Sequence, residues 1–110
     1  MPDDFYCDEV LSGRTPVRSV IETENVLAFH HTRPMWPAHV VVTPRRHVES
    51  LLSLSQGDDA LLQEMVDVIR RVATTISEAH GGCHVVTNIG KYQDSKHLHW
   101  HVYAGERLPD

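Results

Sequence analysis

The sequence predicts an α+β domain in which a mostly antiparallel, five-stranded sheet packs against one long helix. Short runs of β-branched residues occur both before and after residues 58–80, and within 58–80 apolar residues recur at steps of three and four. That recurrence gives a helix one apolar stripe. Strands on both sides of a single helix in the chain are typical of a sheet covered by that helix.

Three strands are expected before the helix. Residues 17–22 and 25–31 are short β-rich runs separated by two residues, which suggests a hairpin and favours antiparallel pairing. Residues 33–37 contain two prolines and form a loop, because proline removes a backbone donor and restricts the backbone. Residues 38–43 are the clearest strand, ended by a proline. The order of the strands in the sheet does not follow from the sequence.

The helix is expected from about Asp58 to His80. Ser55 is a candidate N-cap, and the glycines at 81–82 end the helix because glycine readily adopts the left-handed conformation. The apolar stripe that the helix would bury consists of Leu61, Met65, Val68, Val72, Ile76 and Ala79.

After the helix we expect a strand at 83–88, a loop at 89–95 and a final strand at about 96–103. No repeat, low-complexity segment or linker interrupts the chain. Residues 1–110 are therefore expected to form a single domain.

Composition excludes several classes of function. Ten basic residues against fifteen acidic ones give a net charge of -5, which argues against binding extended nucleic acid but leaves a single small nucleotide compatible. No run reaches the roughly 18 apolar residues of a membrane helix. The first residues resemble no signal peptide, and Cys7 and Cys83 lack a disulfide-like spacing. We therefore expect a cytoplasmic protein that does not bind membranes.

The most informative segment is HLHWHVY at residues 97–103. In a strand, alternate side chains share a face, so His97, His99 and His101 are expected on one side. The other side would then carry Leu98, Trp100 and Val102. Three neighbouring imidazoles can supply a nucleophile, proton donors and cationic contacts to an oxyanion. From the spacing alone, chemistry at phosphorus, a zinc or copper site, and an accidental His-rich strand all remain open.

The segment resembles the His-φ-His-φ-His-φ-φ signature of the histidine-triad (HIT) family, in which φ is an apolar residue. Other blocks resemble the family in order and spacing, so the resemblance covers nearly the whole chain and implies a HIT-like fold. These blocks are Phe5–Cys7, Val26–His30, His39–His47, Val85–Asn88, Gly90 and Gln93.

The resemblance implies an enzyme that cleaves at the α-phosphate of a nucleotide. His99 matches the nucleophile that forms a covalent nucleotidyl-histidine, and a backbone carbonyl beside His97 would hold its other ring nitrogen protonated. His101 matches the histidine that donates to the phosphate oxygens. The implied activity is that of a nucleoside phosphoramidase or a dinucleoside polyphosphate hydrolase, with water resolving the intermediate.

The resemblance also implies nucleotide contacts elsewhere. Gln93 matches a phosphate and leaving-group contact, and Asn88 matches a ribose or phosphate contact, although both residue types also cap turns. Leu27 and Phe29 would line the base pocket or the core, and His30, in the same block, is a further expected nucleotide contact. His39 and His47 could belong to the site. The expected ligand is a purine nucleoside monophosphate or its conjugates, bound by a homodimer.

Three departures from the family pattern affect these expectations. His31 stands where the family commonly has a carboxylate for both ribose hydroxyls, and an imidazole cannot accept two hydroxyl protons. Asp94 follows Gln93 where a Ser or Thr is usual, with Ser95 next, and a carboxylate there would repel phosphate. Some members bind structural zinc, but the matching residues here include only one thiolate, so we expect no metal. Those matching residues are Asp4, Cys7, His47 and His97.

Two other functions remain open because of these departures. A non-catalytic nucleotide-binding regulatory module would retain the pocket without the reaction. A metal-binding protein would use the three histidines of the motif as ligands.

Overall fold

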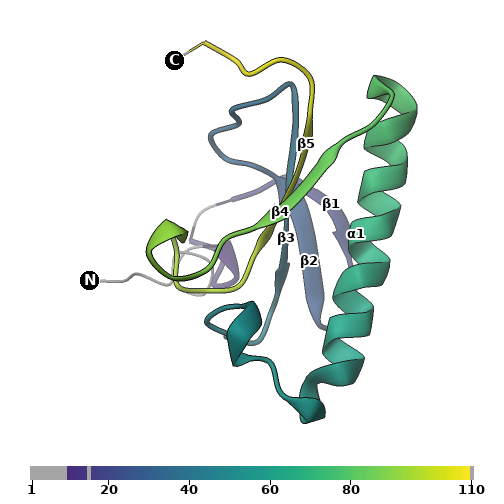
Figure 1. Ribbon diagram of the computed structural model, residues 1–110. Helices are drawn as coiled ribbons and strands as arrows, with labels where there is room; N and C mark the ends of the chain where they lie inside the picture. Colours follow the sequence, from purple (N-terminus) through teal and green to yellow (C-terminus); the bar gives the residue numbers. More distant parts are fainter. Residues whose placement is uncertain (1–9, 15, 110) are drawn as a thin grey trace.

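A computed structural model describes residues 10–14 and 16–109. Their order is β1 (Ser19–Glu22), β2 (Val26–His30), β3 (Ala38–Pro44), α1 (Asp59–His80), β4 (His84–Thr87) and β5 (Trp100–Ala104). The five strands form one sheet in the order β1-β2-β3-β5-β4, with every neighbouring pair antiparallel. The predicted α+β fold is confirmed, and Figure 1 shows α1 running alongside the sheet.

The ends of the helix follow from local contacts. The sequence suggested Ser55 as the N-cap of the helix. In the structure a 3-10 turn, Gln56–Asp58, precedes α1, and Ser55 caps that turn instead. The Ser55 backbone N–H donates to the Asp58 carboxylate at 2.9 Å. Gly81 ends α1 with φ +81°, and its N–H donates to the Ser77 carbonyl at 2.7 Å. Glycine suits this position because side chains disfavour a positive φ.

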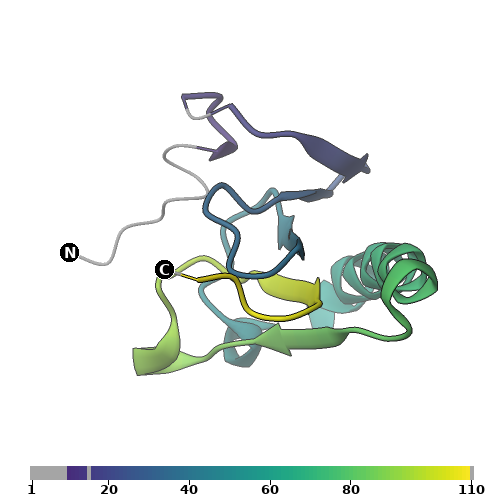
Figure 2. The same ribbon diagram turned by 90° about the horizontal axis from the view of Figure 1, so that it is seen from above.

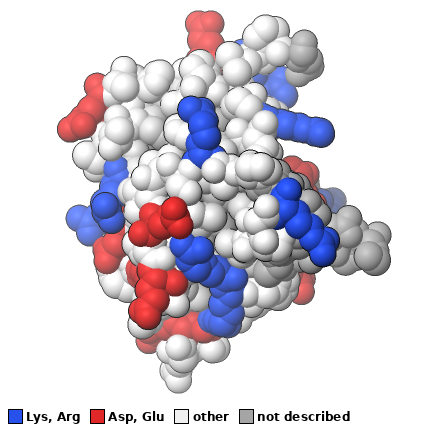
Figure 3. All heavy atoms as spheres, turned by 180° about the vertical axis from the view of Figure 1, so that it is seen from behind, with Lys and Arg blue, Asp and Glu red and all other residues white. Residues whose placement is uncertain are grey.

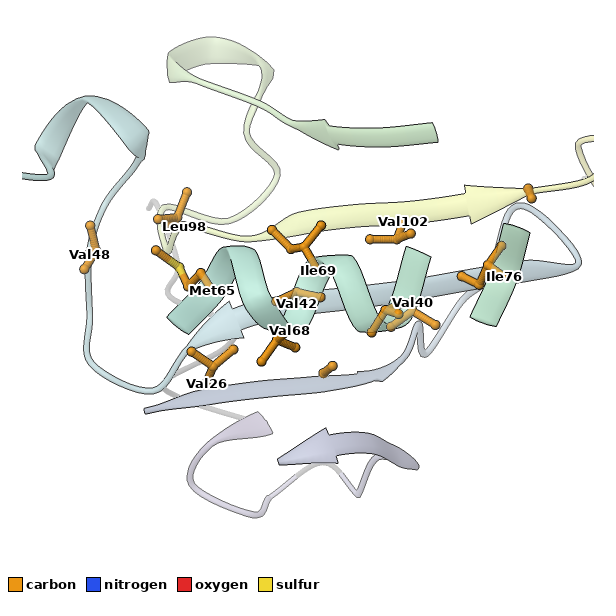
Figure 4. Close-up of a cluster of buried hydrophobic side chains, with 13 residues drawn as sticks. Val26, Val40, Val42, Val48, Met65, Val68, Ile69, Ile76, Leu98 and Val102 are labelled. Carbon is orange, nitrogen blue, oxygen red and sulfur yellow. The ribbon is translucent and has the colours of Figure 1, made fainter. Parts of the chain in front are cut away.

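Alternation along the strands divides the sheet into two faces. The side chains that point toward α1 form the main core with the helix stripe (Figure 4). Because β-strand side chains alternate, the residues between them point to the opposite face. The main core includes Val26, Ala28, Val40, Val42, Met65, Val68, Val72, Leu98 and Val102.

The face away from α1, which we call the open face, carries a second small cluster and the polar rings. Leu27, Phe29 and Val41 pack there with Val10. Leu27 and Phe29, for which the base pocket and the core were both expected, are at least 95% buried in this cluster. In the view of Figure 2, α1 lies at one side and the turn that follows β4 lies at the other.

The last strand is shorter than predicted and begins at Trp100. The Arg45 N–H donates to Asn25 on the β2 side, so the N–H of the preceding residue would face β5. That residue is Pro44, which has no N–H, and the ladder stops there. Residues 97–99 are held by other bonds. Val48 accepts from the Leu98 N–H, and two threonine hydroxyls donate to the carbonyls of Leu98 and His99.

Basic and acidic side chains are interspersed on the surface shown in Figure 3. That face offers no continuous basic surface of the kind that binds extended nucleic acid. Within the described part of the chain, no helix has the length and apolar character needed to cross a membrane.

A histidine-lined cavity on the open face

A cavity of about 440 Å³ opens on the face away from α1. Four of the residues singled out in the sequence line it, namely His31, Asn88, Asp94 and His101. Five further lining residues were not anticipated, and they are Arg33, Met35, Trp36, Val86 and Tyr103. The cavity therefore combines hydrogen-bonding groups with an apolar wall, as small-molecule sites do.

The apolar wall is built around a stacked pair of aromatic rings. Trp36 and Tyr103 have ring centroids 3.9 Å apart and planes inclined by 23°. Trp36 lies in the loop after β2, whereas Tyr103 lies on β5. The sequence offers no local signal for this contact, because it depends on where the loop folds back over the sheet.

The loop over residues 31–37 is held by the segment that follows β5. The Leu108 N–H donates to the Met35 carbonyl at 2.8 Å. Gly105 has φ +94°, and a Cβ there would lie 2.9 Å from the ring of Pro37. Glycine is required at this position both by its backbone conformation and by the close approach of the loop.

His39 was weighed as a site residue and proves to be a buried partner of His101. The Nε2 of His39 lies 2.9 Å from the Nδ1 of His101, and the Met35 N–H donates to the Nδ1 of His39 at 3.1 Å. A nitrogen that accepts carries no proton, so the neutral His39 ring is protonated on Nε2 and donates to His101. His101, in turn, carries its proton on Nε2.

Burial keeps these two rings neutral. It lowers the pKa of His39 to about 3, helped by the neighbouring charges of His31 and His101. It also lowers the pKa of His101 to about 4, with His99 and His31 as further causes, while Asp94 acts in the opposite direction. Both rings therefore act as neutral hydrogen-bonding groups at neutral pH.

His99 is oriented by the backbone of its own motif. Its Nδ1 lies 2.7 Å from the His97 carbonyl, so Nδ1 must be the protonated nitrogen and Nε2 carries the lone pair. This is the hydrogen bond that the resemblance implied. The His99 ring is 4% exposed, and its centroid lies 5.0 Å from that of His101. Burial lowers its pKa, which keeps Nε2 unprotonated.

The side chain of His97 lies elsewhere, contrary to the expectation that three imidazoles share one surface. Its ring is fully buried, Nε2 donates to the Pro44 carbonyl at 2.8 Å, and the ring packs edge-on against His47 at 5.3 Å. The expectation was wrong because the Pro44 carbonyl and the His47 ring hold the side chain of His97 outside the lining of the cavity. Within the motif, His97 contributes its backbone carbonyl to His99.

The sequence matches the HIT domain over residues 12–108. The chain belongs to the HIT family. A HIT-like protein of Azospirillum brasilense is 33% identical over 110 residues, which span 97% of this chain and 89% of the relative.

Solved HIT structures share the fold over nearly the whole chain. A histidine triad protein of Clostridium difficile has a TM-score of 0.79 at 31% identity and covers 96% of this chain and 93% of its own. A HIT family hydrolase of Legionella pneumophila has a TM-score of 0.83 at 25% identity and covers 97% and 96%. The five-stranded sheet and its helix are therefore the HIT architecture.

His31, at the position where this HIT chain departs from the family pattern, belongs to the histidine cluster. Its ring stacks on that of His39, with centroids 4.3 Å apart, and its Nδ1 accepts from the Arg33 N–H at 2.9 Å. The preceding His30 is exposed and lines a separate shallow depression, which it shares with His31. His31 therefore stands between the two hollows.

The loop before the motif divides into internal and cavity-facing residues. Gln93 donates to the carbonyls of Glu49 and Ser95 at 2.8 and 3.1 Å and accepts from the Gly90 N–H. Gln93 and Ser95 are both buried, and Gln93 organises the loop. Asp94, between them, is exposed and lines the cavity.

One group of histidines in the described ranges is close enough to hold a metal ion, and it is not the sequence motif. A ring nitrogen from each of His31, His39 and His101 lies within 4.8 Å of the others. Metal-bound imidazoles donate their second nitrogen to an acceptor. Here two of the rings accept from backbone N–H groups instead, so these residues do not fit a resident metal.

For the expected lack of zinc, only two of the four matching residues can be placed. His47 and His97 are in ring contact, whereas Asp4 and Cys7 lie outside the described residues.

Proposed function

We propose that this HIT protein is a nucleotide hydrolase that cleaves at the α-phosphate of nucleoside phosphoramidates or related nucleotides. The observation that carries the proposal is the His99 Nδ1 contact with the His97 carbonyl, at 2.7 Å. That bond leaves Nε2 with the lone pair that an attack on phosphorus needs.

In the first step, the Nε2 lone pair of His99 forms a bond to the α-phosphorus. The bond between phosphorus and the leaving amine, phosphate or acyl group breaks, and the leaving group takes that electron pair together with a proton from solvent, which the attacking water returns in the second step. Water then attacks the nucleotidyl-histidine, which restores His99 and releases a nucleoside monophosphate. Splitting one displacement into two is the advantage of a covalent intermediate.

His101 supports both steps by donating from Nε2 to a phosphoryl oxygen. The chain from the Met35 N–H through His39 to His101 holds that proton in place before the ligand arrives. Preorganised donors of this kind stabilise developing charge without a cost of reorientation. The stacked rings of Trp36 and Tyr103 offer an apolar wall on one side of the cavity.

The test is incubation with an adenosine phosphoramidate, followed by mass spectrometry for an adenylyl group on His99. The wild-type protein should show the adduct and release adenosine monophosphate. His99→Ala should lose both, with turnover reduced by roughly 10⁴- to 10⁶-fold. His80→Ala is the matched control, because His80 is an exposed histidine at the end of α1.

Equal turnover by wild type and His99→Ala would remove the proposal. Nucleotide binding without any adduct or turnover in the wild-type protein would identify a non-catalytic nucleotide-binding module instead.

A further inference from the structure

We propose that His31 is a second phosphoryl-oxygen donor, which acts beside His101 through its Nε2–H. The inference deepens the proposed function and rests on it only in placing a phosphoryl group in the cavity. It assigns a catalytic contact to a residue that, from its sequence position, was expected to weaken ribose recognition.

The protonation of His31 follows from its backbone neighbour. The Arg33 N–H points at the Nδ1 of His31 at 2.9 Å, and a backbone N–H can only donate. Nδ1 is therefore unprotonated, and a neutral ring has its single proton on Nε2. Burial also lowers the pKa of His31, which favours the neutral ring. His99 lowers that pKa further, whereas Asp94 and the backbone contact with Arg33 raise it.

The position of His31 places that donor beside His101. Both side chains line the same cavity, and their ring centroids are 5.8 Å apart with planes inclined by 29°. The stack of His31 on His39 fixes the plane of the ring. A phosphoryl group presents several acceptor oxygens on one centre, so two donors at this spacing can each take one oxygen.

His31 and His101 line the cavity, and His99, buried behind them with its ring centroid 5.0 Å from that of His101, completes a complementary set. His99 offers a lone pair to phosphorus, while His31 and His101 offer N–H groups to its oxygens. Each tautomer is determined by a separate backbone contact, from the His97 carbonyl, the Arg33 N–H and the Met35 N–H through His39. The same contacts disfavour a metal among these rings, as argued above.

The cavity also holds one acidic and one basic side chain. Asp94 is exposed, so solvent partly screens its repulsion of an anion, although its charge acts on the pKa of His31 and of His101. Arg33 lines the same cavity and brings a positive charge to it.

The first experiment determines the tautomer directly. Long-range ¹H–¹⁵N spectra of ¹⁵N-labelled protein should show His31 protonated on Nε2 near neutral pH, with assignment by His31→Phe. Addition of inorganic phosphate should shift the Nε2 resonance of His31 together with that of His101. A proton on Nδ1 of His31, or no response to phosphate in the wild-type protein, would overturn the proposal.

The second experiment separates phosphoryl contact from support of the fold. His31→Phe keeps a ring that can stack on His39 but has no N–H, whereas His31→Gln restores a neutral donor. His31→Phe should slow formation of the His99 adduct by about 10- to 100-fold and weaken orthovanadate binding in the presence of adenosine. Adenosine alone should bind unchanged, and His31→Gln should recover part of the loss. His101→Phe serves as the positive control.

The outcomes distinguish this inference from the proposed function. A wild-type protein that forms no adduct, but whose phosphate or orthovanadate binding depends on His31, would refute only the hydrolase. A wild-type protein that forms the adduct at the same rate as His31→Phe would refute the role of His31. Equal losses for adenosine and orthovanadate would show a merely structural residue and would also refute it.

Discussion

His97 and His101 belong to the same histidine motif, yet they perform different tasks in the structure. His97 is fully buried and bonded to the Pro44 carbonyl. His101 lines the cavity and receives its hydrogen bond from another imidazole. The difference arises where the β3–β5 ladder stops, because only residues after that point are aligned by strand pairing.

The alternation of side chains along a strand predicts the face of the sheet on which a side chain lies, but it does not predict which group that side chain bonds. At the buried end, a backbone carbonyl takes the imidazole proton, and the ring becomes part of the support of the fold. At His101, within β5, the hydrogen bonds from the Met35 N–H to His39 and from His39 to His101 leave the His101 proton on Nε2, which can donate into the cavity. Variants at the two ends should therefore fail in different ways.

The largest effect on stability is expected at the buried end. His97→Ala removes a fully buried ring and leaves the Pro44 carbonyl without its donor. We expect the free energy of unfolding to fall by about 3 kcal/mol, from the cavity and the lost hydrogen bond together. Urea denaturation measures this.

The control for that variant is His97→Gln, which keeps a donor and much of the volume and should lose clearly less. If His97→Ala unfolds at the same urea concentration as the wild type, the supporting role assigned to His97 is wrong.

The bonded pair His39 and His101 should instead make the stability of the fold depend on pH. Burial lowers the pKa of His39 to about 3 and of His101 to about 4, whereas the unfolded chain titrates near 6.5. Between these values the unfolded state binds more protons, so stability falls as the pH drops from about 6.5 toward 4. Each group contributes at most about 1.4 kcal/mol per pH unit in that window.

Urea unfolding of the wild type and of His39→Gln, between about pH 7.5 and pH 4.5, tests this pH dependence. The variant has lost one of the buried titrating groups, so its stability should vary less steeply with pH. Identical slopes for the two proteins would contradict the assignment.

The smallest effects are expected at the two threonines that hold the irregular residues between the two ends. Thr43 donates to the Leu98 carbonyl at 2.9 Å, and Thr87 donates to the His99 carbonyl at 2.7 Å. Replacement by valine keeps the shape and removes the hydroxyl. We expect a loss of about 1 kcal/mol for each, larger for the fully buried Thr43.

Differential scanning calorimetry measures both losses, and Thr87→Ser, which keeps the hydroxyl, is the control for Thr87→Val. A Thr43→Val variant as stable as the wild type would show that its bond does not support residues 97–99.

Local patterns were sufficient for most of the fold. The stripe at steps of three and four placed the helix within about one residue of its observed ends, since this periodicity depends only on near neighbours. The order of the strands could not be predicted, because β3 pairs with β5, and the whole of α1 separates these two strands in the sequence. The point at which the β3–β5 pairing stops could have been inferred from Pro44 if the pairing of β3 with β5 had been known.

The contacts of the site could be predicted where both partners lie within the histidine motif. They could not be predicted where a residue's partner is distant in the sequence. The His97 carbonyl beside His99 is local to the motif and was anticipated. The bond of His39 to His101 requires the register of two distant strands. The inward turn of Gln93 likewise depends on the Glu49 carbonyl, far away in the chain.

The attachment of the loop over residues 31–37 has a consequence for how the protein is made. Met35 is held by Leu108 through a backbone bond and by Arg107 across 72 positions of sequence. A ribosome must therefore release the segment after β5 before that loop can close over the sheet. A nascent chain could form the β1–β2 hairpin and α1 early, but it would carry no competent cavity until residues 105–108 had left the exit tunnel.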